Sequence, residues 1–527
     1  NLVMCYNIIF LHFFILGWLT KIFSKKFLRR KNSSWPVNIF DFRFANGRDN
    51  LFYSRRIGRN PRGETTAANG EFVNYPRETS ILGAAKFSGK TKNGWSIGVL
   101  ESVTANEYAT VRDVNSNDRE EIVEPLTNYF VARAQKDFNK RNTYIGGIFT
   151  ATNRDLANNF PTLHKAAYTG GIDFNHNWND RNYFLDGNII LSHVKGSKSA
   201  ITATQHHIRH NFGRVDASHV NVDVNRTSLT GTGGRIEVGK NGGGNWRYNG
   251  GFIWRSPELE LNDVGFLRQT DEIIQFANVR YLWQKPTNTY RDIQLKFQQF
   301  SVYDFESNFN KIQYEIQGNI NWKNNWWTEV ELGYIPRNFS NTFLRGGSRW
   351  LFSDENYFVL FFGSDQSKKF NFTLGHVNGA ARQKNFSFKR YVLRLNYQPF
   401  DALSMSLNTE YSQNPSKTQY VTKANNNGAS RYILGEIDNQ SLSTTLRLNY
   451  SINPNLSIQY YGQPFIARGR YSNFNYVNNS ISEDLNDRVK RILKPRIDEF
   501  NEWKKRSEIE LRNRFEIEKT YLKSQVE

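Results

Sequence analysis

Residues 311–322 read KIQYEIQGNINW, and this stretch carries the pattern that decides the fold. Apolar residues or glycine alternate strictly with polar ones. Side chains alternate between the two faces of a β-strand, whereas a helix of 3.6 residues per turn would mix the two sets. The stretch therefore predicts a strand with two different faces. One face carries Ile312, Tyr314, Ile316, Gly318, Ile320 and Trp322, and the other carries Gln313, Glu315, Gln317, Asn319 and Asn321.

The same alternation recurs from about Ile81 to Tyr476, in segments of about ten residues. Residues 391–398 and 442–451 show it clearly: Leu393 and Leu395 fall opposite Arg394 and Asn396. Counting such segments predicts roughly 20–24 strands, and bacterial outer-membrane barrels have an even number. We therefore expect an all-β fold: a large antiparallel transmembrane β-barrel with a helical C-terminal tail.

The composition agrees with this expectation. The chain has 527 residues and a formal net charge of +20; 38% of its residues are hydrophobic and 15% are aromatic. The mean hydropathy of −0.65 excludes a bundle of transmembrane helices, and the aromatic content argues against disorder. A barrel wall that alternates apolar and polar residues keeps the mean hydropathy low. A soluble propeller or a stack of sandwiches stays open as an alternative, although no repeat of 40 to 50 residues is visible.

The connections between segments alternate in length. We expect tight turns at 93–94, 324–325, 399–401, 438–439 and 453–455, and long polar connections at 112–127, 213–228 and 414–430. Outer-membrane barrels have short periplasmic turns and long extracellular loops. The pattern thus favours a barrel with two unlike rims.

Four regions follow from these patterns. Residues 1–45 form an N-terminal hydrophobic and basic extension outside the barrel, in which positive charges follow the apolar run instead of preceding it. Residues 46–79 form a linker or plug segment, and residues 80–477 form the barrel. Residues 478–527 form a charged tail that we expect to be helical after Pro495, because its apolar residues are scattered among dense mixed charges.

Catalytic and metal-binding patterns are weak. His206, His207 and His210 lie within five residues, but on a strand His207 would point away from the other two. Carboxylates surround residues 259–267 without the spacing of a calcium-binding EF-hand loop. The glycine-rich stretches 231–234 and 242–244 lack the lysine of a phosphate-binding loop. The single cysteine, Cys5, excludes a disulfide framework, and we expect neither a metal, a cofactor nor catalytic residues.

Several longer strings resemble a barrel family of unknown function found in Gram-negative outer membranes. The resemblance covers about residues 44–476 and rests on strings in the family's order: 52–59, 78–86, 94–101, 225–229, 242–246, 254–257, 261–268 and 460–465. The resemblance implies an outer-membrane barrel that in relatives usually follows a β-sandwich similar to a family 9 carbohydrate-binding module. This chain has no room for that module, and its tail departs from the further strands expected after Tyr476. The family supplies no catalytic residues.

These observations lead to one set of expectations. Ile316, Leu393, Leu395, Leu446 and Leu448 should face lipid, while Glu315, Gln317, Arg394, Asn396 and Arg447 should face the lumen. Residues 46–79 either form a partial plug or link a preceding module to the first strand. In the plug hypothesis, its arginines pair with lumen carboxylates. The candidate plug and lumen residues are Arg55, Arg56, Arg59, Glu315, Glu329, Arg394 and Arg447.

The expected function is a non-enzymatic pore or a transport or secretion component in the cell outer membrane. Two alternatives are a barrel-anchored surface protein that binds glycans or acts as a scaffold, and an outer-membrane hydrolase. The expected partners are outer-membrane lipid and lipopolysaccharide, the barrel-assembly machinery, and glycans bound through the N-terminal module of relatives. The positive charge is spread along the chain and not clustered beside aromatic residues, so we expect no nucleic acid partner.

Overall fold

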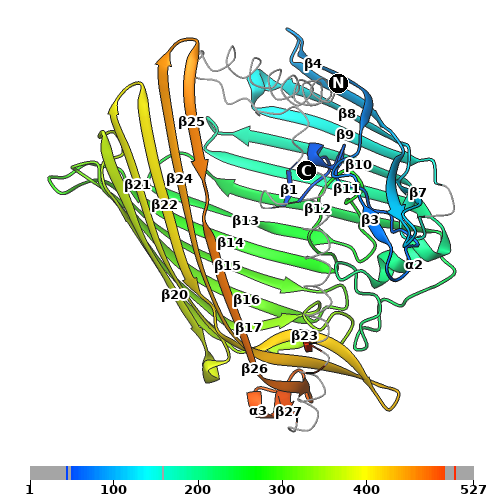
Figure 1. Ribbon diagram of the computed structural model, residues 1–527. Coiled ribbons are helices and arrows are strands. Elements are labelled where there is room, and N and C mark those ends of the chain that lie inside the picture. Colours follow the sequence, from blue (N-terminus) through cyan, green and yellow to red (C-terminus); the bar gives the residue numbers. More distant parts are fainter. Residues whose placement is uncertain (1–42, 46–48, 157–159, 493–501, 503, 506–527) are drawn as a thin grey trace. The chain divides into compact units, whose positions relative to one another are not determined.

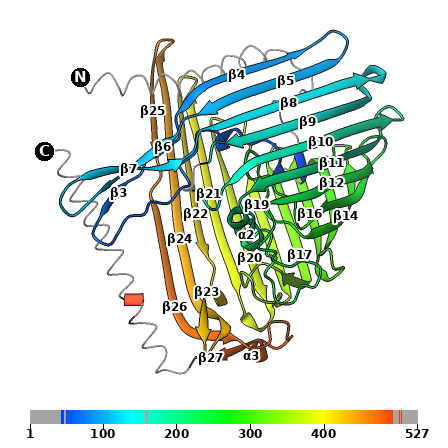
Figure 2. The same cartoon turned by 90° about the vertical axis from the view of Figure 1, so that its right-hand side faces the viewer.

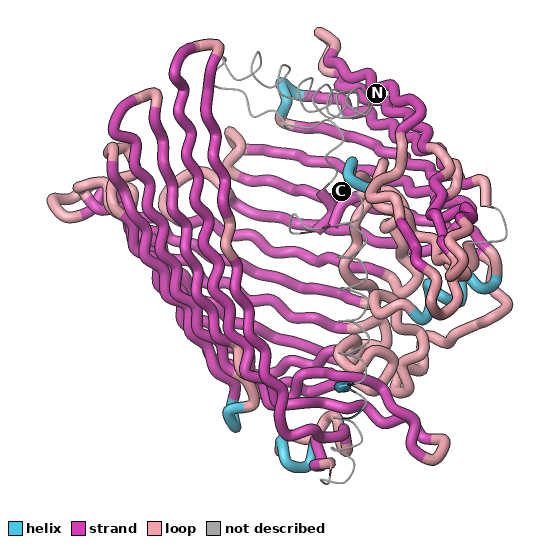
Figure 3. The backbone as a smooth tube through the Cα atoms, viewed as in Figure 1, coloured by secondary structure: helices cyan, strands magenta, loops and turns pink. Residues whose placement is uncertain are grey.

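The computed structural model describes residues 43–45, 49–156, 160–492, 502 and 504–505. Strands dominate this part of the chain (Figure 3), and its two α-helices are α2 (Lys198–His206) and α3 (Leu485–Arg488). Three single 3-10 turns are η1 (Ser54–Arg56), η2 (Asn139–Arg141) and η3 (Arg382–Lys384). None of the helices in the described residues is long and apolar enough to cross a membrane. The predicted helix after Pro495 lies almost wholly outside the described residues.

Twenty-two strands follow one another around an antiparallel barrel, which confirms the predicted fold class (Figure 1). The wall consists of β4 (Ile81–Lys90), β5 (Trp95–Thr104), β8 (Thr127–Phe138), β9 (Thr143–Arg154), β10 (His164–Trp178), β11 (Tyr183–Gly196), β12 (Ser228–Lys240), β13 (Trp246–Arg255), β14 (Glu272–Trp283), β15 (Tyr290–Tyr303), β16 (Phe309–Trp322), β17 (Trp327–Ser340), β18 (Trp350–Phe352), β19 (Glu355–Gly363), β20 (Phe370–Ala381), β21 (Ser387–Phe400), β22 (Leu403–Gln413), β23 (Ser416–Asn426), β24 (Ala429–Asn453), β25 (Leu456–Gly462), β26 (Phe465–Val477) and β27 (Val489–Arg491).

We call each position of the wall that runs from one rim to the other a stave. Three staves consist of two strands each: β18 with β19, β22 with β23, and β25 with β26. β24 pairs with both β22 and β23 on one side and with both β25 and β26 on the other, and β17 pairs with both β18 and β19. Pro415 and Pro464 lie at two of the breaks, where proline cannot donate a ladder hydrogen bond. Since β27 is only a three-residue strand beside β26, the wall described here has eighteen staves.

The long strand β24 corrects two sequence expectations. Residues 438–439, predicted to form a tight turn, lie inside β24 and pair with Arg470 and Gly469 of β26. The region 414–430, predicted to be a long loop, contains β23 and a two-residue hairpin turn. Polar residues that face the lumen resemble the residues of a turn in composition. Composition alone therefore predicted a turn at 438–439 and a loop at 414–430, where the structure has strands.

The two faces of the wall differ as the alternation predicted. On β16, Ile316 is 48% exposed on the outer face and Glu315 is 8% exposed on the inner face. The outer face continues around the barrel with Ile172, Ile189, Ile236, Phe252, Phe297, Leu332 and Leu374, all exposed. An exposed apolar surface of this extent is typical of a wall that faces lipid or a protein partner.

The barrel has two unlike rims. The short-turn rim consists of nine connections of two to six residues, the first at 91–94 and the last at 454–455. The long-loop rim carries α2, the connection 256–271 and a small sheet of β3 (Phe72–Asn74), β6 (Glu107–Arg112) and β7 (Asp118–Glu124). These elements gather at one end of the strands in both views (Figures 1 and 2). The short strands β1 (Arg43–Ala45) and β2 (Asp49–Asn50) pair with each other.

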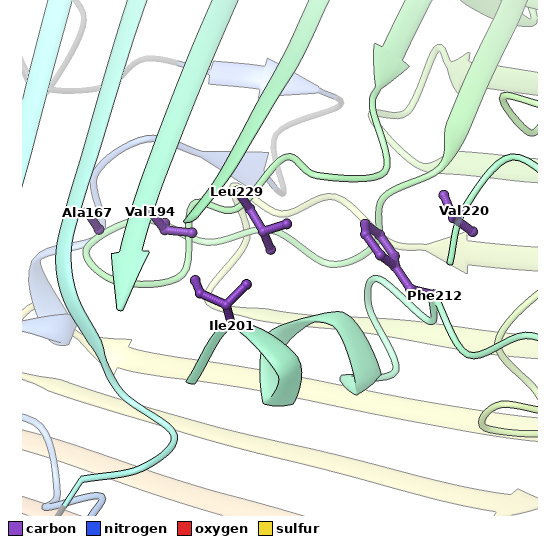
Figure 4. Close-up of a cluster of buried hydrophobic side chains, with 6 residues drawn as sticks. All are labelled: Ala167, Val194, Ile201, Phe212, Val220 and Leu229. Carbon is purple, nitrogen blue, oxygen red and sulfur yellow. The ribbon is translucent and has the colours of Figure 1, made fainter. Parts of the chain in front are cut away.

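Helix α2 is fixed at the long-loop rim by a buried apolar cluster (Figure 4). Ser197 caps the helix by accepting a hydrogen bond from the amide of Ala200, as expected for serine at an N-cap. Ile201 points from the helix towards the wall. The cluster consists of Ala167, Val194, Ile201, Phe212, Val220 and Leu229. The connection between β11 and β12 is therefore a folded part of the molecule.

Candidate functional site

The inner face of the wall is a continuous polar surface. Strand register places Gln298 opposite Glu315, and Gln317 opposite Glu331. Gln298 donates a hydrogen bond to Glu315, and the Tyr357 hydroxyl donates another to Glu315 Oε2 at 2.7 Å. These bonds join β15 to β16 and, across β17, β16 to β19, so the side chains on this part of the inner face hold one another in place.

Glycine makes room for this arrangement on β17. A Cβ atom at Gly333 would lie 2.0 Å from the ring of Tyr357, so any larger residue would displace that ring from Glu315. Gln317 Nε2 donates to Glu329 Oε1 at 2.7 Å on the same face. The lumen thus presents carboxylates and amides side by side, which can exchange hydrogen bonds with a passing polar solute.

A cavity of about 880 Å³ lies against the inner wall of β10 to β15. Six Lys or Arg residues and two carboxylates line it, so its charge is positive on balance. Arg235 and Glu237 form an ion pair, and the Arg235 guanidinium lies 5.7 Å from the centre of the Phe276 ring. The charged residues are Arg235, Lys240, Arg247, Arg268, Arg280 and Lys296, with Asp186 and Glu237. The excess of positive charge favours anionic groups over cationic ones at this surface.

The connection 256–271 lies on the inner wall at the long-loop end. The Glu260 amide donates to Ser192 Oγ at 3.0 Å, and the side chain of Ser192 belongs to the inner face of β11. Gly231 of β12 lies directly beneath this connection, because a Cβ atom there would be 2.1 Å from the amide nitrogen of Leu259. The connection therefore occupies part of the lumen. Together with residues 49–62 and 197–227 it is called the loop plug below.

Asp263 joins the loop plug to the wall. Arg154 Nη1 donates to Asp263 Oδ1 at 2.6 Å, and His164 Nδ1 lies 2.8 Å from Asp263 Oδ2. The other ring nitrogen of His164 lies 2.7 Å from Thr204 Oγ1 on α2. A register shift at the start of β10 re-aims His164 towards the lumen. Burial opposes ionisation of Asp263, but the charges and hydrogen bonds of His164 and Arg154 outweigh it and hold its pKa well below the ordinary value.

Within the loop plug, a second buried pair holds the connection 256–271 to the α2 connection 197–227. His210 Nε2 lies 2.9 Å from Glu260 Oε2, and His210 Nδ1 lies 2.8 Å from the Pro257 carbonyl oxygen. Burial favours the neutral form of Glu260. The hydrogen bond and charge of His210 and the charge of Arg209 are stronger and lower the pKa of Glu260 to about 2. Glu260 is therefore an ionised, buried carboxylate at neutral pH.

Residues 49–62 complete the plug. Arg255 Nη2 donates to Asp49 Oδ2 at 2.5 Å, and Arg255 Nη1 donates to Glu272 Oε2 at 3.0 Å. Arg56 Nε donates to the Gly265 carbonyl at 3.0 Å, and its Nη2 donates to Asn262 Oδ1 at 3.1 Å. Removing one member of such a buried ion pair lowers the stability of the fold strongly, because the other charge remains buried without a partner. The described part of the segment before the barrel is thus fixed to the connection 256–271.

The structure places the sequence-predicted residues in two separate groups. Glu315, Glu329, Arg394 and Arg447 lie on the inner face of the wall by strand register. Arg55, Arg56 and Arg59 lie in the plug segment, where Arg55 is exposed and burial lowers the pKa of Arg59. Among the described residues, no ion pair joins these arginines to Glu315 or Glu329; Arg56 contacts Gly265 and Asn262 instead. The first group shares the inner face of the wall, and the second group lies in the loop plug.

Sequence reasoning missed the residues that bind the plug. No local sequence pattern marks Arg154, Asp49 or Arg255. Arg154 pairs with Asp263, 109 residues away, and Asp49 pairs with Arg255, 206 residues away. In the sequence His210 belongs to a weak metal pattern, whereas in the structure it pairs with Glu260. Within the described residues no group of three metal-binding side chains occurs. One signal was present: the strings 52–59 and 261–268, on which the family resemblance rests, are in contact through Arg56.

A family model matches residues 44–506. The chain belongs to that family, Domain of unknown function (DUF5916). The predicted resemblance to a barrel family of unknown function is confirmed to this extent, and the association of DUF5916 with a carbohydrate-binding module remains a prediction. None of the proteins of curated function matches this DUF5916 chain.

Several solved outer-membrane porin structures are similar to this DUF5916 chain at a low level. The structure of Pseudomonas aeruginosa OpdK with vanillate has 11% identity and a TM-score of 0.35, covering 73% of this chain and 96% of that one. A BenF-like porin from Pseudomonas fluorescens Pf-5 has 10% identity and a TM-score of 0.31, covering 72% and 98%. An anion-selective porin from Comamonas acidovorans has 10% identity and a TM-score of 0.29, covering 62% and 91%. Likeness at these scores carries neither a solute nor a mechanism to this chain.

Proposed function

We propose that this barrel is a non-enzymatic channel of the outer membrane whose lumen admits small anionic solutes and whose long-loop end is narrowed by the ion-paired loop plug. The apolar outer face supports the membrane assignment, because lipid-facing and lumen-facing residues alternate in transmembrane barrels. Barrels with 16 to 18 strands enclose an aqueous channel. The wall described here has eighteen staves, so it is wide enough to enclose an aqueous channel that a plug can narrow.

The cavity of about 880 Å³ is the observation that supports small anions as the solutes. Six cationic side chains project around it, against two carboxylates, one of which is already paired with Arg235. A cluster of one sign of charge in a low-dielectric wall raises the local concentration of counter-ions. Small carboxylates or other monoanions are therefore the expected solutes, and no specific compound follows from the geometry.

Reversal potentials across a planar bilayer under a KCl gradient test this proposal. The wild-type barrel should pass chloride more readily than potassium. The double variant Arg280→Gln/Lys296→Gln should lower the anion-to-cation permeability ratio about twofold or more, since it removes two of the six cations lining the cavity. The matched control Lys195→Gln/Lys389→Gln removes two charges from the outer face and should leave the ratio unchanged. A barrel that conducts without ion preference, or responds equally to both variants, would overturn the solute assignment.

The hydrolase alternative is tested in the same preparation. Lipid and glycoside hydrolysis are measured for the wild type and for Glu315→Gln, which changes the carboxylate held by Tyr357 and Gln298. Turnover that Glu315→Gln abolishes, in a barrel that carries no ion current, would replace the channel with an enzyme. Conductance without turnover supports the channel.

A further inference from the structure

The direction of the strands determines where the two ends of the barrel lie. β4 begins at Ile81 beside the end of β5 at Thr104, and Thr104 leads into the long connection that contains β6 and β7. β26 runs from the short turn at 454–455, by way of β25, back to the same rim. With eighteen staves both ends must be at one rim. The residues before β4 and after β26 therefore leave the wall at the long-loop rim.

The nine short turns carry a strong positive charge. Their 37 residues contain eight Lys or Arg and three Asp, whereas the connections of the long-loop rim contain eleven Lys or Arg and fifteen Asp or Glu. The cations of the short turns are Lys92, Lys140, Arg141, Arg181, Lys285, Lys323, Lys368 and Lys369. The two rims thus have opposite net charge, and only the short-turn rim would attract a surface of phosphate groups.

Aromatic residues lie at the strand ends next to these short turns, on the outer face of the wall. Trp246 and Tyr281 have ring centres 4.8 Å apart, and Tyr281 and Trp283 have ring centres 4.6 Å apart. Lys136 Nζ lies 5.3 Å from the centre of the exposed Trp95 ring. Aromatic rings at this position mark the level of the lipid headgroups. The cations of the short turns therefore lie at or just beyond the headgroup level of one leaflet.

We propose that the short-turn rim binds the phosphate groups of lipopolysaccharide in the outer leaflet, so that the long-loop rim, the loop plug and both ends of the barrel face the periplasm. This inference rests on the membrane assignment proposed above but not on the proposed solute. It reverses the usual arrangement, in which short turns are periplasmic. Only turns of two to six residues then cross the membrane during assembly, whereas the opposite orientation would move the longer, charged connections of the long-loop rim across it, among them 105–126, 197–227 and 256–271.

Cysteine labelling in whole cells tests the orientation. The single native cysteine is replaced by Cys5→Ser, and one new cysteine is added by Asn288→Cys in the β14–β15 turn or by Val114→Cys in the exposed β6–β7 turn. A membrane-impermeant maleimide should label Asn288→Cys in intact cells and Val114→Cys only after the outer membrane is opened. The reverse pattern, or labelling of both in intact cells, would overturn the orientation. Protection of both together with extraction of the protein by carbonate would refute the membrane barrel itself.

Binding to purified lipid tests the partner. The barrel in detergent is titrated with vesicles that contain lipopolysaccharide or, in a second arm, phosphatidylglycerol. Lys285→Gln/Lys323→Gln should weaken binding to lipopolysaccharide roughly tenfold or more, since each surface cation contributes to attraction by anionic lipid. The control Lys195→Gln/Lys389→Gln removes two exposed cations nearer the long-loop rim and should change binding little. Equal loss in both variants, or a loss seen only with phosphatidylglycerol, would overturn lipopolysaccharide as the partner.

Discussion

Arg154, the last residue of β9, donates a hydrogen bond of 2.6 Å to Asp263, which lies 109 residues further along the chain in the connection between β13 and β14. Both side chains are buried. The pair ties the connection 256–271 to the inner face of the wall, beside the contacts of Glu260 with Ser192 and His210.

Asp263→Asn should release the connection 256–271 from the wall. The variant keeps the shape of the side chain but leaves the Arg154 charge buried without its counter-ion, which costs about 3–5 kcal/mol in comparable buried pairs. Hydrogen exchange of amides 256–271 should become faster, and the single-channel conductance should rise. Asp180→Asn in an exposed short turn is the matched control and should alter neither quantity.

Acid should loosen the plug through Glu260. Its folded pKa of about 2 lies below the ordinary value of 4.5, so its contribution to plug stability is fully present above about pH 4.5 and is lost as the pH falls towards 2. The ionisable groups that act on Glu260 are His210, Arg209 and Asp263, with Arg56, His164 and His207. Protease cleavage within 256–271 should increase over that range. In Glu260→Gln the loop should already be susceptible at pH 7 and should respond less to acid; an unchanged acid response would assign the effect to other groups.

Gly231→Ala should push the plug off the wall by steric means. The added Cβ would lie 2.1 Å from the Leu259 nitrogen, so backbone must shift, and overpacking of this kind costs about 1–3 kcal/mol. The urea midpoint of the purified barrel should fall. Gly170→Ala, where a Cβ meets no atom within 4 Å, should leave the midpoint within error. Equal midpoints for both variants would mean that the connection does not rest on Gly231.

Arginine should be tolerated on one face of β16 and not on the other. Ile316→Arg places a charge on the exposed outer face, at a cost of roughly 2–4 kcal/mol near the middle of a bilayer, whereas Gln317→Arg points into the lumen beside Glu329. Ile316→Arg should reduce the amount of heat-modifiable, folded barrel in outer-membrane fractions, and Gln317→Arg should not. Similar yields would contradict the membrane wall.

The sequence by itself determined the strands and their faces. Period-two alternation in 311–322 correctly predicted β16 and its two faces, because the direction of a side chain on a strand depends only on its position in that strand. The same reasoning failed at 438–439, where polar residues in the middle of β24 had the composition of a turn. Local composition cannot distinguish a solvated lumen position from a solvated turn.

Only the tertiary structure decided what fills the barrel and which residues hold it. Asp49, Arg154 and His164 carry no local sequence pattern, and each gains its role from a partner 99 or more residues away. His210 belongs to a weak metal pattern in the sequence, but its partner in the structure is Glu260, 50 residues away. Their pairing depends on the antiparallel order of the staves, which places the ends of β9 and β13 and the start of β10 at one rim. Alternation is a local property of the chain, whereas a buried ion pair between distant segments exists only after the staves have set the register between them.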